Sequence, residues 1–173
     1  MKQWMTKGAL VWAAAAVLWA GEWSIVIPPE GEPGQPLIVE GRVFAEDGET
    51  PLQGVKVHVY HTDHEGYYSP GGRNESQHRL KGDMITDGEG RYRFKTIRPA
   101  PYPGGRIPAH IHYVISGPGM ARRTFELNFA DDPILSESQL QRWTQRGTFS
   151  RVRPAEEDAS GVLHVRKDIR ISR

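Results

Sequence analysis

The chain of 173 residues contains no cysteine, which excludes a thiol nucleophile, a disulfide framework and a zinc–thiolate site. It also carries almost no excess charge: the formal net charge is +1, and no run of Lys or Arg forms a track for phosphates. We therefore expect no nucleic-acid partner. With 38% hydrophobic and 25% charged residues, the composition fits one globular domain with a packed core.

Long apolar runs are also lacking, because the longest one covers only residues 8–20. A membrane-spanning helix needs about 20 apolar residues. Lys2 and Lys7 precede this run and no acidic residue does, which is typical of a secretory signal. We expect residues 1–20 to be a signal peptide cleaved after Ala20, with an uncleaved anchor as the alternative. The expected product is exported, periplasmic or extracellular, with no stable membrane span after cleavage.

Short alternating runs dominate the rest of the chain. Residues 21–36 are rich in prolines and glycines, which predicts an extended linker before a domain over residues 37–173. Alternating apolar and polar residues between turn signals predict an antiparallel β-sandwich. One short helix is expected over residues 136–146, with Ser136 as its cap. The expected strands are residues 37–44, 55–61, 92–97, 110–116, 124–129 and 162–171.

A His-x-His pair stands near two turns that carry tyrosines. His110 and His112 lie on an expected strand, so they share one face about 6.6 Å apart along the chain. Two satisfied polar positions would explain such a pair equally well. A metal site is favoured because Tyr102 lies between two prolines nearby and the pair Tyr67 and Tyr68 follows an earlier strand.

Two tyrosines and two histidines form an unusual ligand set. A phenolate is a hard anionic oxygen donor, whereas imidazole suits many transition metals. Because a free phenol has a pKa of about 10, a tyrosinate at neutral pH needs a strongly polarising cation. A trivalent hard ion such as Fe(III) meets that requirement better than Zn(II) or Fe(II).

Several motifs together resemble one known family. They follow its order over residues 38–133, and the resemblance is to the intradiol ring-cleavage dioxygenases, the family of catechol 1,2-dioxygenase and protocatechuate 3,4-dioxygenase. The matching stretches are Val55-Lys56-Val57-His58-Val59-Tyr60-His61, Gly66-Tyr67-Tyr68, Thr86-Asp87-Gly88-Glu89-Gly90-Arg91-Tyr92-Arg93-Phe94, Arg98-Pro99-Ala100-Pro101-Tyr102-Pro103 and Pro108-Ala109-His110-Ile111-His112-Tyr113.

The resemblance implies a prealbumin-like fold and an activity. By it, Tyr68, Tyr102, His110 and His112 hold Fe(III), with a hydroxide completing the ligand shell. A catecholic substrate then reacts with O2, and the ring opens between its two hydroxylated carbons to give a muconate-type diacid. Tyr102 also acts as a catalytic residue, because it leaves the metal and takes a substrate proton. No external reductant is needed.

Two positions depart from the family. The family carries an arginine directly before its Pro-x-His-x-His segment, where this chain has Ile107 with Arg106 one residue earlier. Glu126 stands where the family tends to have a glutamine. A carboxylate beside a catecholate is repulsive unless it is protonated or paired with a cation, such as Arg106 or Arg123. We expect Arg106 to take over the work of the missing arginine as a catalytic residue.

Other interpretations explain less. A non-catalytic transthyretin-like or carboxypeptidase-regulatory-like binding domain accounts for the strands and the hairpin at residues 87–90, but not for the Tyr and His set. A cupin site needs a glutamate four or five residues after the second histidine, but in this chain Ser116 and Gly117 occupy those positions. The sequence names neither the catechol nor the oligomeric state. The remaining histidines are expected at the surface or behind the ligands, namely His58, His61, His64, His78 and His164.

Overall fold

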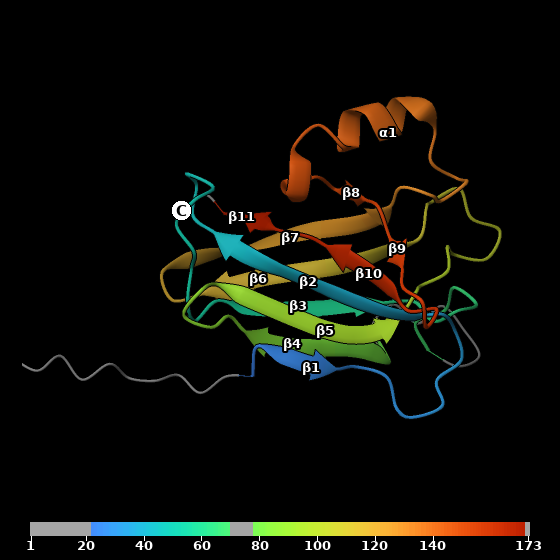
Figure 1. Ribbon diagram of the computed structural model, residues 1–173, viewed down its shortest axis with the longest axis horizontal. Coiled ribbons are helices and arrows are strands. Elements are labelled where there is room, and N and C mark those ends of the chain that lie inside the picture. The colour runs from blue at the N-terminus through green and yellow to red at the C-terminus, as the bar shows by residue number, and fades with distance from the viewer. Residues whose placement is uncertain (1–21, 70–77, 172–173) are drawn as a thin grey trace, which may run out of the picture.

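The protein is a sandwich of two β-sheets with one short helix at its edge (Figure 1). The computed structural model describes residues 22–69 and 78–171. Its elements are β1 (Ser24–Val26), β2 (Pro36–Phe44), β3 (Lys56–His61), β4 (Leu80–Ile85), β5 (Arg91–Ile97), β6 (His110–Gly117), β7 (Met120–Phe129), α1 (Glu137–Trp143), a 3-10 turn (Gly147–Phe149), β8 (Val152–Arg153), β9 (Glu156–Glu157), β10 (Leu163–Arg166) and β11 (Ile169–Arg170).

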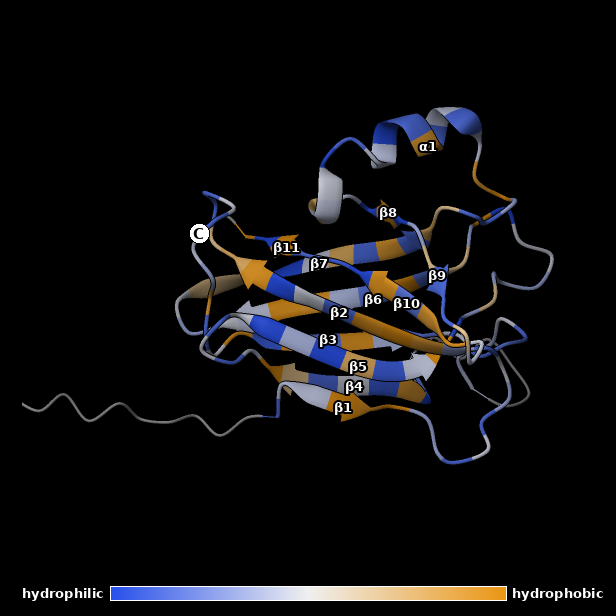
Figure 2. Cartoon of the chain, in the orientation of Figure 1, coloured by the Kyte–Doolittle hydropathy of each residue, from blue (hydrophilic) through white to orange (hydrophobic). Residues whose placement is uncertain are grey.

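One sheet has the order β1-β5-β2-β10-β9, with β11 also paired to β2, and the other has the order β4-β3-β6-β7-β8. Buried and more exposed residues alternate along β3 and the first half of β2, although hydropathy does not: β2 shows an orange stretch, then blue and pale residues, then an orange tip (Figure 2). The apolar side chains meet between the sheets, where each buried one stabilises the fold by about 1.5–3 kcal/mol. This core includes Leu37, Val39, Val57, Val59, Phe94, Ile111, Ile115, Leu127, Phe129 and Val165.

The expected sandwich and its short helix are confirmed, but its antiparallel character is only partly right. The long ladders β2–β5, β3–β4, β3–β6 and β6–β7 are antiparallel. Four shorter pairs are parallel: β1–β5, β10–β2, β11–β2 and β7–β8. Parallel pairs require long connections rather than hairpins. Alternation along a single strand carries no information on the direction of its partner.

Some element boundaries also differ from the expectation. Residues 21–36, expected as a linker, contain β1, which joins the sheet beside β5. The expected strand 162–171 is divided into β10 and β11 by the buried residues Lys167 and Asp168. Lys167 donates hydrogen bonds to the carbonyls of Phe149 and Ser150, and Asp168 accepts one from the N–H of Arg42. The short β1, β8 and β9 and the polar β4 were not expected.

The helix is shorter than expected and its start is as predicted. Ser136 accepts a hydrogen bond from the N–H of Gln139, whose side chain accepts one from the N–H of Ser136, so the two residues form a capping box. The helix ends at Trp143. The expected signal, residues 1–20, lies outside the described residues. Within residues 22–69 and 78–171, no helix has the length and apolar character needed to cross a membrane.

Candidate metal centre

β6 presents the histidine pair on the outer face of its sheet. His110 and His112 alternate with Ile111, which is fully buried in the core. Their Nε2 atoms lie 2.9 Å apart. The geometry expected from strand alternation is therefore present, and both rings aim at the same point.

Two loops bring tyrosines to that point. Tyr68 follows β3, and Tyr102 lies in the connection between β5 and β6. The Tyr68 hydroxyl lies 2.7 Å from the Tyr102 hydroxyl and 3.0 Å from His112 Nε2. The Tyr102 hydroxyl lies 3.3 Å from His110 Nε2. Together with the contact between the two histidine Nε2 atoms, these distances close a ring of four polar atoms. We call the four residues, Tyr68, Tyr102, His110 and His112, the Tyr/His ring.

The Tyr/His ring has the dimensions of a metal coordination shell. Nitrogen and oxygen ligands lie about 2.0–2.1 Å from a first-row metal ion, so neighbouring ligands are about 2.9–3.4 Å apart in square or tetrahedral arrangements. Three of the four separations, 2.9, 3.0 and 3.3 Å, lie in that range, and the fourth, 2.7 Å between the two tyrosine hydroxyls, is slightly shorter. Small adjustments of the side chains therefore suffice for all four atoms to contact one ion.

The protonation of both histidines suits metal binding. His110 Nδ1 lies 2.8 Å from the carbonyl oxygen of Pro108, which can accept only an N–H and so leaves Nε2 with its lone pair toward the ring. Burial lowers the pKa of His112 to about 4, and electrostatic interaction with the neighbouring His110, His78 and Arg151 contributes in the same direction. His112 is therefore neutral at physiological pH.

The two tyrosine loops pack directly against each other. Gly66 has φ +90°, and a Cβ at this position would lie 2.1 Å from the carbonyl oxygen of Pro101. The backbone of Asp63 accepts a hydrogen bond from Ala100, and its side chain accepts one from Tyr67. The glycine and the aspartate thus fix the position of Tyr68 relative to the loop that carries Tyr102.

Two buried side chains hold the backbone just before His110. Asp132 accepts a hydrogen bond of 2.7 Å from the N–H of Ala109. Asn128 donates one of 3.1 Å to the carbonyl of the same residue. The sequence reasoning missed both residues, because they lie 19 and 23 residues further along the chain. A polar residue on the outer face of a strand or in a loop gives no local sign of its partner.

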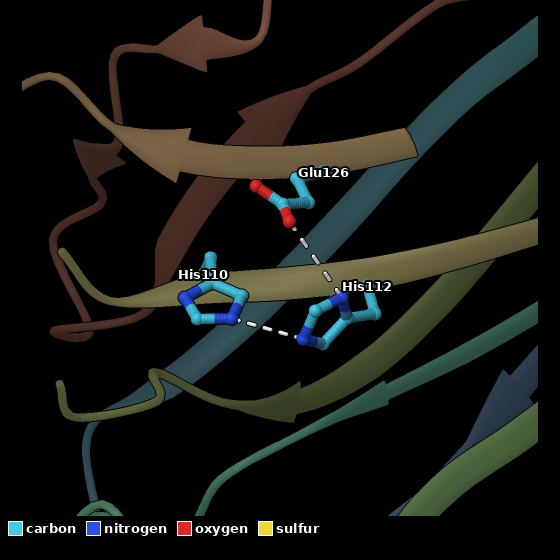
Figure 3. A group of neighbouring side chains, drawn as sticks. All are labelled: His110, His112 and Glu126. Atoms are coloured by element: carbon cyan, nitrogen blue, oxygen red, sulfur yellow. Dashed lines mark hydrogen bonds and ion pairs between the residues drawn. The ribbon is translucent and has the colours of Figure 1, made fainter. Parts of the chain in front are cut away.

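Glu126 is the third member of a possible metal-binding group with His110 and His112 (Figure 3). Two histidines and one carboxylate are a common set for Fe(II). However, Glu126 lies 3.9 Å from His112 Nδ1, on the other side of that ring from the Nε2 that faces His110. Its carboxylate also forms an ion pair with Arg151. The geometry therefore favours the tyrosines over Glu126 as partners of the histidines.

Two pockets border the Tyr/His ring. A pocket of about 230 Å³ is lined by Tyr68, Tyr102 and the exposed Arg106 and Ile107. A larger pocket, of about 820 Å³, borders His112 and is also lined by Glu126, part of residues 142–151 and residues 167–170. The expected catalytic residue Arg106 thus lies at the rim of the smaller pocket, beside the tyrosines.

The other histidines fall into three groups. His58 and His164 pair with Asp83 and Asp158, and His64 is exposed, as expected for surface residues. His78 stacks on Tyr60 with ring centroids 3.8 Å apart and also contacts Tyr68. His61 was expected at the surface or behind the ligands, and it lies in neither place.

His61 is fully buried on the core face of β3, between the carbonyl of Thr62 and the hydroxyl of Thr96. Strand alternation does place it opposite to His58, as predicted. The error arose because a histidine with two internal hydrogen-bond partners packs like a core residue.

Comparisons with known proteins identify the family of this chain. The model of the family described as "Dioxygenase" matches residues 22–172. Catechol 1,2-dioxygenase 2 of Acinetobacter lwoffii is 36% identical over 141 residues, which cover 72% of this chain and 50% of that protein. The protocatechuate 3,4-dioxygenase beta chain of Burkholderia cepacia is 32% identical over 137 residues, covering 70% of this chain and 57% of that one.

Solved structures show the same likeness. Catechol 1,2-dioxygenase from Acinetobacter sp. ADP1 superposes with a TM-score of 0.68 at 28% identity, over 87% of this chain and 57% of that one. The dioxygenase domain of a carbohydrate-binding fusion protein from Streptomyces sp. SirexAA-E gives 0.65 at 26% identity, over 85% and 86%. The chain spans about half the length of the curated relative from A. lwoffii. Since the family match covers nearly all of the described residues, the chain belongs to the intradiol ring-cleavage dioxygenase family.

Proposed function

We propose that this protein is an exported non-haem Fe(III) dioxygenase that opens a catecholic ring with O2 between its two hydroxylated carbons. The observation that carries the proposal is the Tyr/His ring, in which two phenols and two imidazoles converge within 2.7–3.3 Å. The similarity to catechol 1,2-dioxygenases over 72% of the chain supports the substrate class. The product is a muconate-type diacid.

The donor set supports Fe(III) as the cofactor. Two phenolate oxygens are hard anionic donors, and their deprotonation at neutral pH requires a strongly polarising ion. His112, whose pKa is about 4, and His110, whose Nδ1 hydrogen-bonds to Pro108, complete the set as nitrogen donors through Nε2. When bound here, ferric iron would act as a Lewis acid and an orienting template for the catechol. Catechol plus O2 has the atoms of the diacid, so the reaction needs no reductant.

Tyr102 is suited to receive a proton from the substrate. Its hydroxyl lies between Tyr68 Oη and His110 Nε2, at 2.7 and 3.3 Å. The side chain is half-buried and borders the pocket of about 230 Å³ beside Gly104 and Gly105, which leaves room for it to turn away. We infer that its phenolate oxygen accepts one of the two catechol hydroxyl protons.

Reconstitution with iron tests the proposal. The protein supplied with Fe(III) should become coloured, because tyrosinate-to-iron charge transfer absorbs in the visible, and should consume one O2 per catechol. His110→Ala should lose iron and colour, whereas His164→Ala, which changes an exposed histidine paired with Asp158, should keep both. Colourless protein without iron after reconstitution would contradict the proposal and favour a non-catalytic transthyretin-like binding domain.

A further inference from the structure

Glu126 introduces a negative charge into the wall of the larger pocket, directly beside the Tyr/His ring. It is the register partner of His112 on the neighbouring strand β7, and His112 in turn pairs with Tyr60 on β3. These three residues therefore form one row across the outer face of the sheet. An unpaired carboxylate here would repel a catecholate, so the row needs a cation.

Arg151 supplies that cation, and among the residues that the structure describes neither Arg106 nor Arg123 forms an ion pair with Glu126. Its guanidinium forms an ion pair with Glu126. Arg151 Nε also donates a hydrogen bond of 2.7 Å to Asn128 Oδ1, and Asn128 lies on the same face of β7 as Glu126. Arg123 is exposed further along β7, and Arg106 is exposed on the loop before β6.

A third contact fixes the guanidinium in one orientation. Arg151 Cζ lies 4.1 Å from the centroid of the Trp143 ring, at the end of α1. The backbone of Arg151 is also held, because its carbonyl accepts a hydrogen bond of 2.9 Å from the N–H of Asn128. Ion pair, hydrogen bond and ring contact together pre-organise a charge that would otherwise sample many rotamers.

The held guanidinium faces the pocket that reaches the Tyr/His ring. His112, Glu126, Trp143 and Arg151 all line the cavity of about 820 Å³. The Arg151 side chain keeps 39% of its surface exposed there, so it is available to a ligand as well as to Glu126. A fixed cation in a pocket wall stabilises negative charge without reorganisation.

We propose that Arg151 is the substrate-facing cation of this site, held in place by Glu126, Asn128 and Trp143. The assignment rests on the proposed function, and it replaces the role expected for Arg106. The family resemblance places an arginine directly before the Pro-x-His-x-His segment, where this chain has Ile107. The compensating positive charge comes from the β8 edge of the same sheet, through the pair of Glu126 and Arg151.

Variants of the iron-loaded protein test this assignment with two readouts. The first is the dissociation constant for catechol under nitrogen, followed by visible absorbance, and the second is kcat/KM in air. Arg151→Ala should weaken catechol binding about tenfold or more and lower kcat/KM by about 10²–10³ while iron content stays unchanged. Arg123→Ala removes the same charge from an exposed site on β7 and should leave both values within twofold.

Two further variants distinguish a direct role of Arg151 from neutralisation of Glu126. They are Arg151→Lys and the double variant Arg151→Ala with Glu126→Gln. Lys keeps the charge but not the fork that holds Glu126 and Asn128, so we expect a partial loss of kcat/KM. The double variant should remain at least tenfold below the parent in kcat/KM. Recovery to the parent value in the double variant would overturn the assignment, because Arg151 would then serve only to neutralise Glu126.

Three further outcomes have separate meanings. Values for Arg151→Ala within twofold of an active parent would overturn the inference and leave the proposed function intact. Loss of iron from both Arg151→Ala and Arg151→Lys would also overturn it, because Arg151 would then be a structural support of the ring. A parent that binds iron and turns over no catechol would contradict the proposed function itself.

Discussion

The hydroxyl oxygens of Tyr68 and Tyr102 lie 2.7 Å apart, although the two residues belong to separate loops 34 positions apart in the chain. At this distance one phenol donates a hydrogen bond to the other, so the pair shares a proton between two oxygens. Each oxygen also lies near a histidine nitrogen, at 3.0 Å for Tyr68 and 3.3 Å for Tyr102. Exchange of the phenolic protons for one cation would satisfy all four atoms.

Tyr68→Phe should therefore lose both iron and visible colour. The substitution removes one anionic oxygen from the ring and leaves the ring packing of Tyr68 against Tyr60 and His78 largely in place. Tyr67→Phe is the matched control, because it changes the adjacent tyrosine, whose hydroxyl is not part of the Tyr/His ring. Metal analysis and the visible spectrum measure the difference.

Glu126→Gln separates the two possible ligand sets. If the histidines bind metal with Glu126 rather than with the tyrosines, this variant should lose iron while Tyr68→Phe keeps it. The position of Glu126 at His112 Nδ1 predicts the reverse result. Retention of iron by Tyr68→Phe would contradict the assignment of the Tyr/His ring.

Gly66→Ala should destabilise the protein and weaken iron binding together. A Cβ at Gly66 would lie 2.1 Å from the Pro101 carbonyl oxygen, so the loops that carry Tyr68 and Tyr102 would have to separate. We expect a loss of about 2–3 kcal/mol in the free energy of unfolding. Gly104→Ala is the control, since φ there is +70° but the space is open, and strain alone costs about 1 kcal/mol. Equal iron affinity in both variants would argue against this coupling.

The histidine pair and the sandwich could be predicted from the sequence, because both depend on alternation along single strands. Alternation on a strand places His110 and His112 on one face whatever the strand's partners are. The choice of Tyr68 over Tyr67 came from resemblance, and the structure places the hydroxyl of Tyr68 in the ring. Local geometry and short motifs were thus enough to predict those parts of the site that depend on residues close together in the sequence.

Contacts between distant segments were beyond such reasoning. Arg151 meets Glu126 across 25 positions only because β8 joins β7 in parallel, and parallel pairing leaves no mark in a two-residue strand. Asp132 and Asn128 look like ordinary polar residues until Ala109 lies beside them. The expectation for Arg106 rested on proximity in sequence alone, and it stays a prediction.

His61 should make the protein less stable in acid. Burial lowers its pKa from 6.5 to about 4 in the folded state, so between these values the unfolded chain binds a proton that the folded protein does not. The free energy of unfolding should therefore keep its highest value with respect to His61 above pH 6.5, and it should fall by up to about 3 kcal/mol as the pH falls to 4. Urea unfolding across this range measures the slope.

His61→Gln should reduce that slope relative to the parent, because glutamine does not titrate. His164→Gln is the control, since His164 is exposed and pairs with Asp158 at the surface. A parent and a His61→Gln variant with the same dependence on pH would show that burial of His61 does not control the acid sensitivity.

Export predicts a shortened product. Lys2 and Lys7 before the apolar residues 8–20 support cleavage after Ala20. Mass spectrometry of protein recovered from its native compartment should therefore find a chain that begins at Gly21. Replacing Leu10 by Arg would interrupt the apolar run and should leave the chain unprocessed. A protein with an intact Met1 in the cytoplasm would contradict the proposal.

Asp132→Ala should weaken iron binding without removing any member of the Tyr/His ring. The buried Asp132 accepts hydrogen bonds from the N–H groups of Ala109 and Ile134, and the first of these fixes the backbone next to His110. A misplaced ligand typically costs about 10–100-fold in metal affinity. An unpaired buried N–H adds a loss of about 1–3 kcal/mol in stability.

Asp131→Ala is a closely matched control for this effect. Asp131 is the adjacent residue, but its carboxylate is exposed and pairs with Arg98 at the surface, an interaction worth at most about 1 kcal/mol. Asp132→Asn should recover part of the iron affinity, because its amide oxygen can still accept the hydrogen bond from Ala109. Iron titration of the three variants measures this order. Equal affinities for Asp132→Ala and Asp131→Ala would mean that His110 is held by its strand alone, since β6 pairs with both β3 and β7.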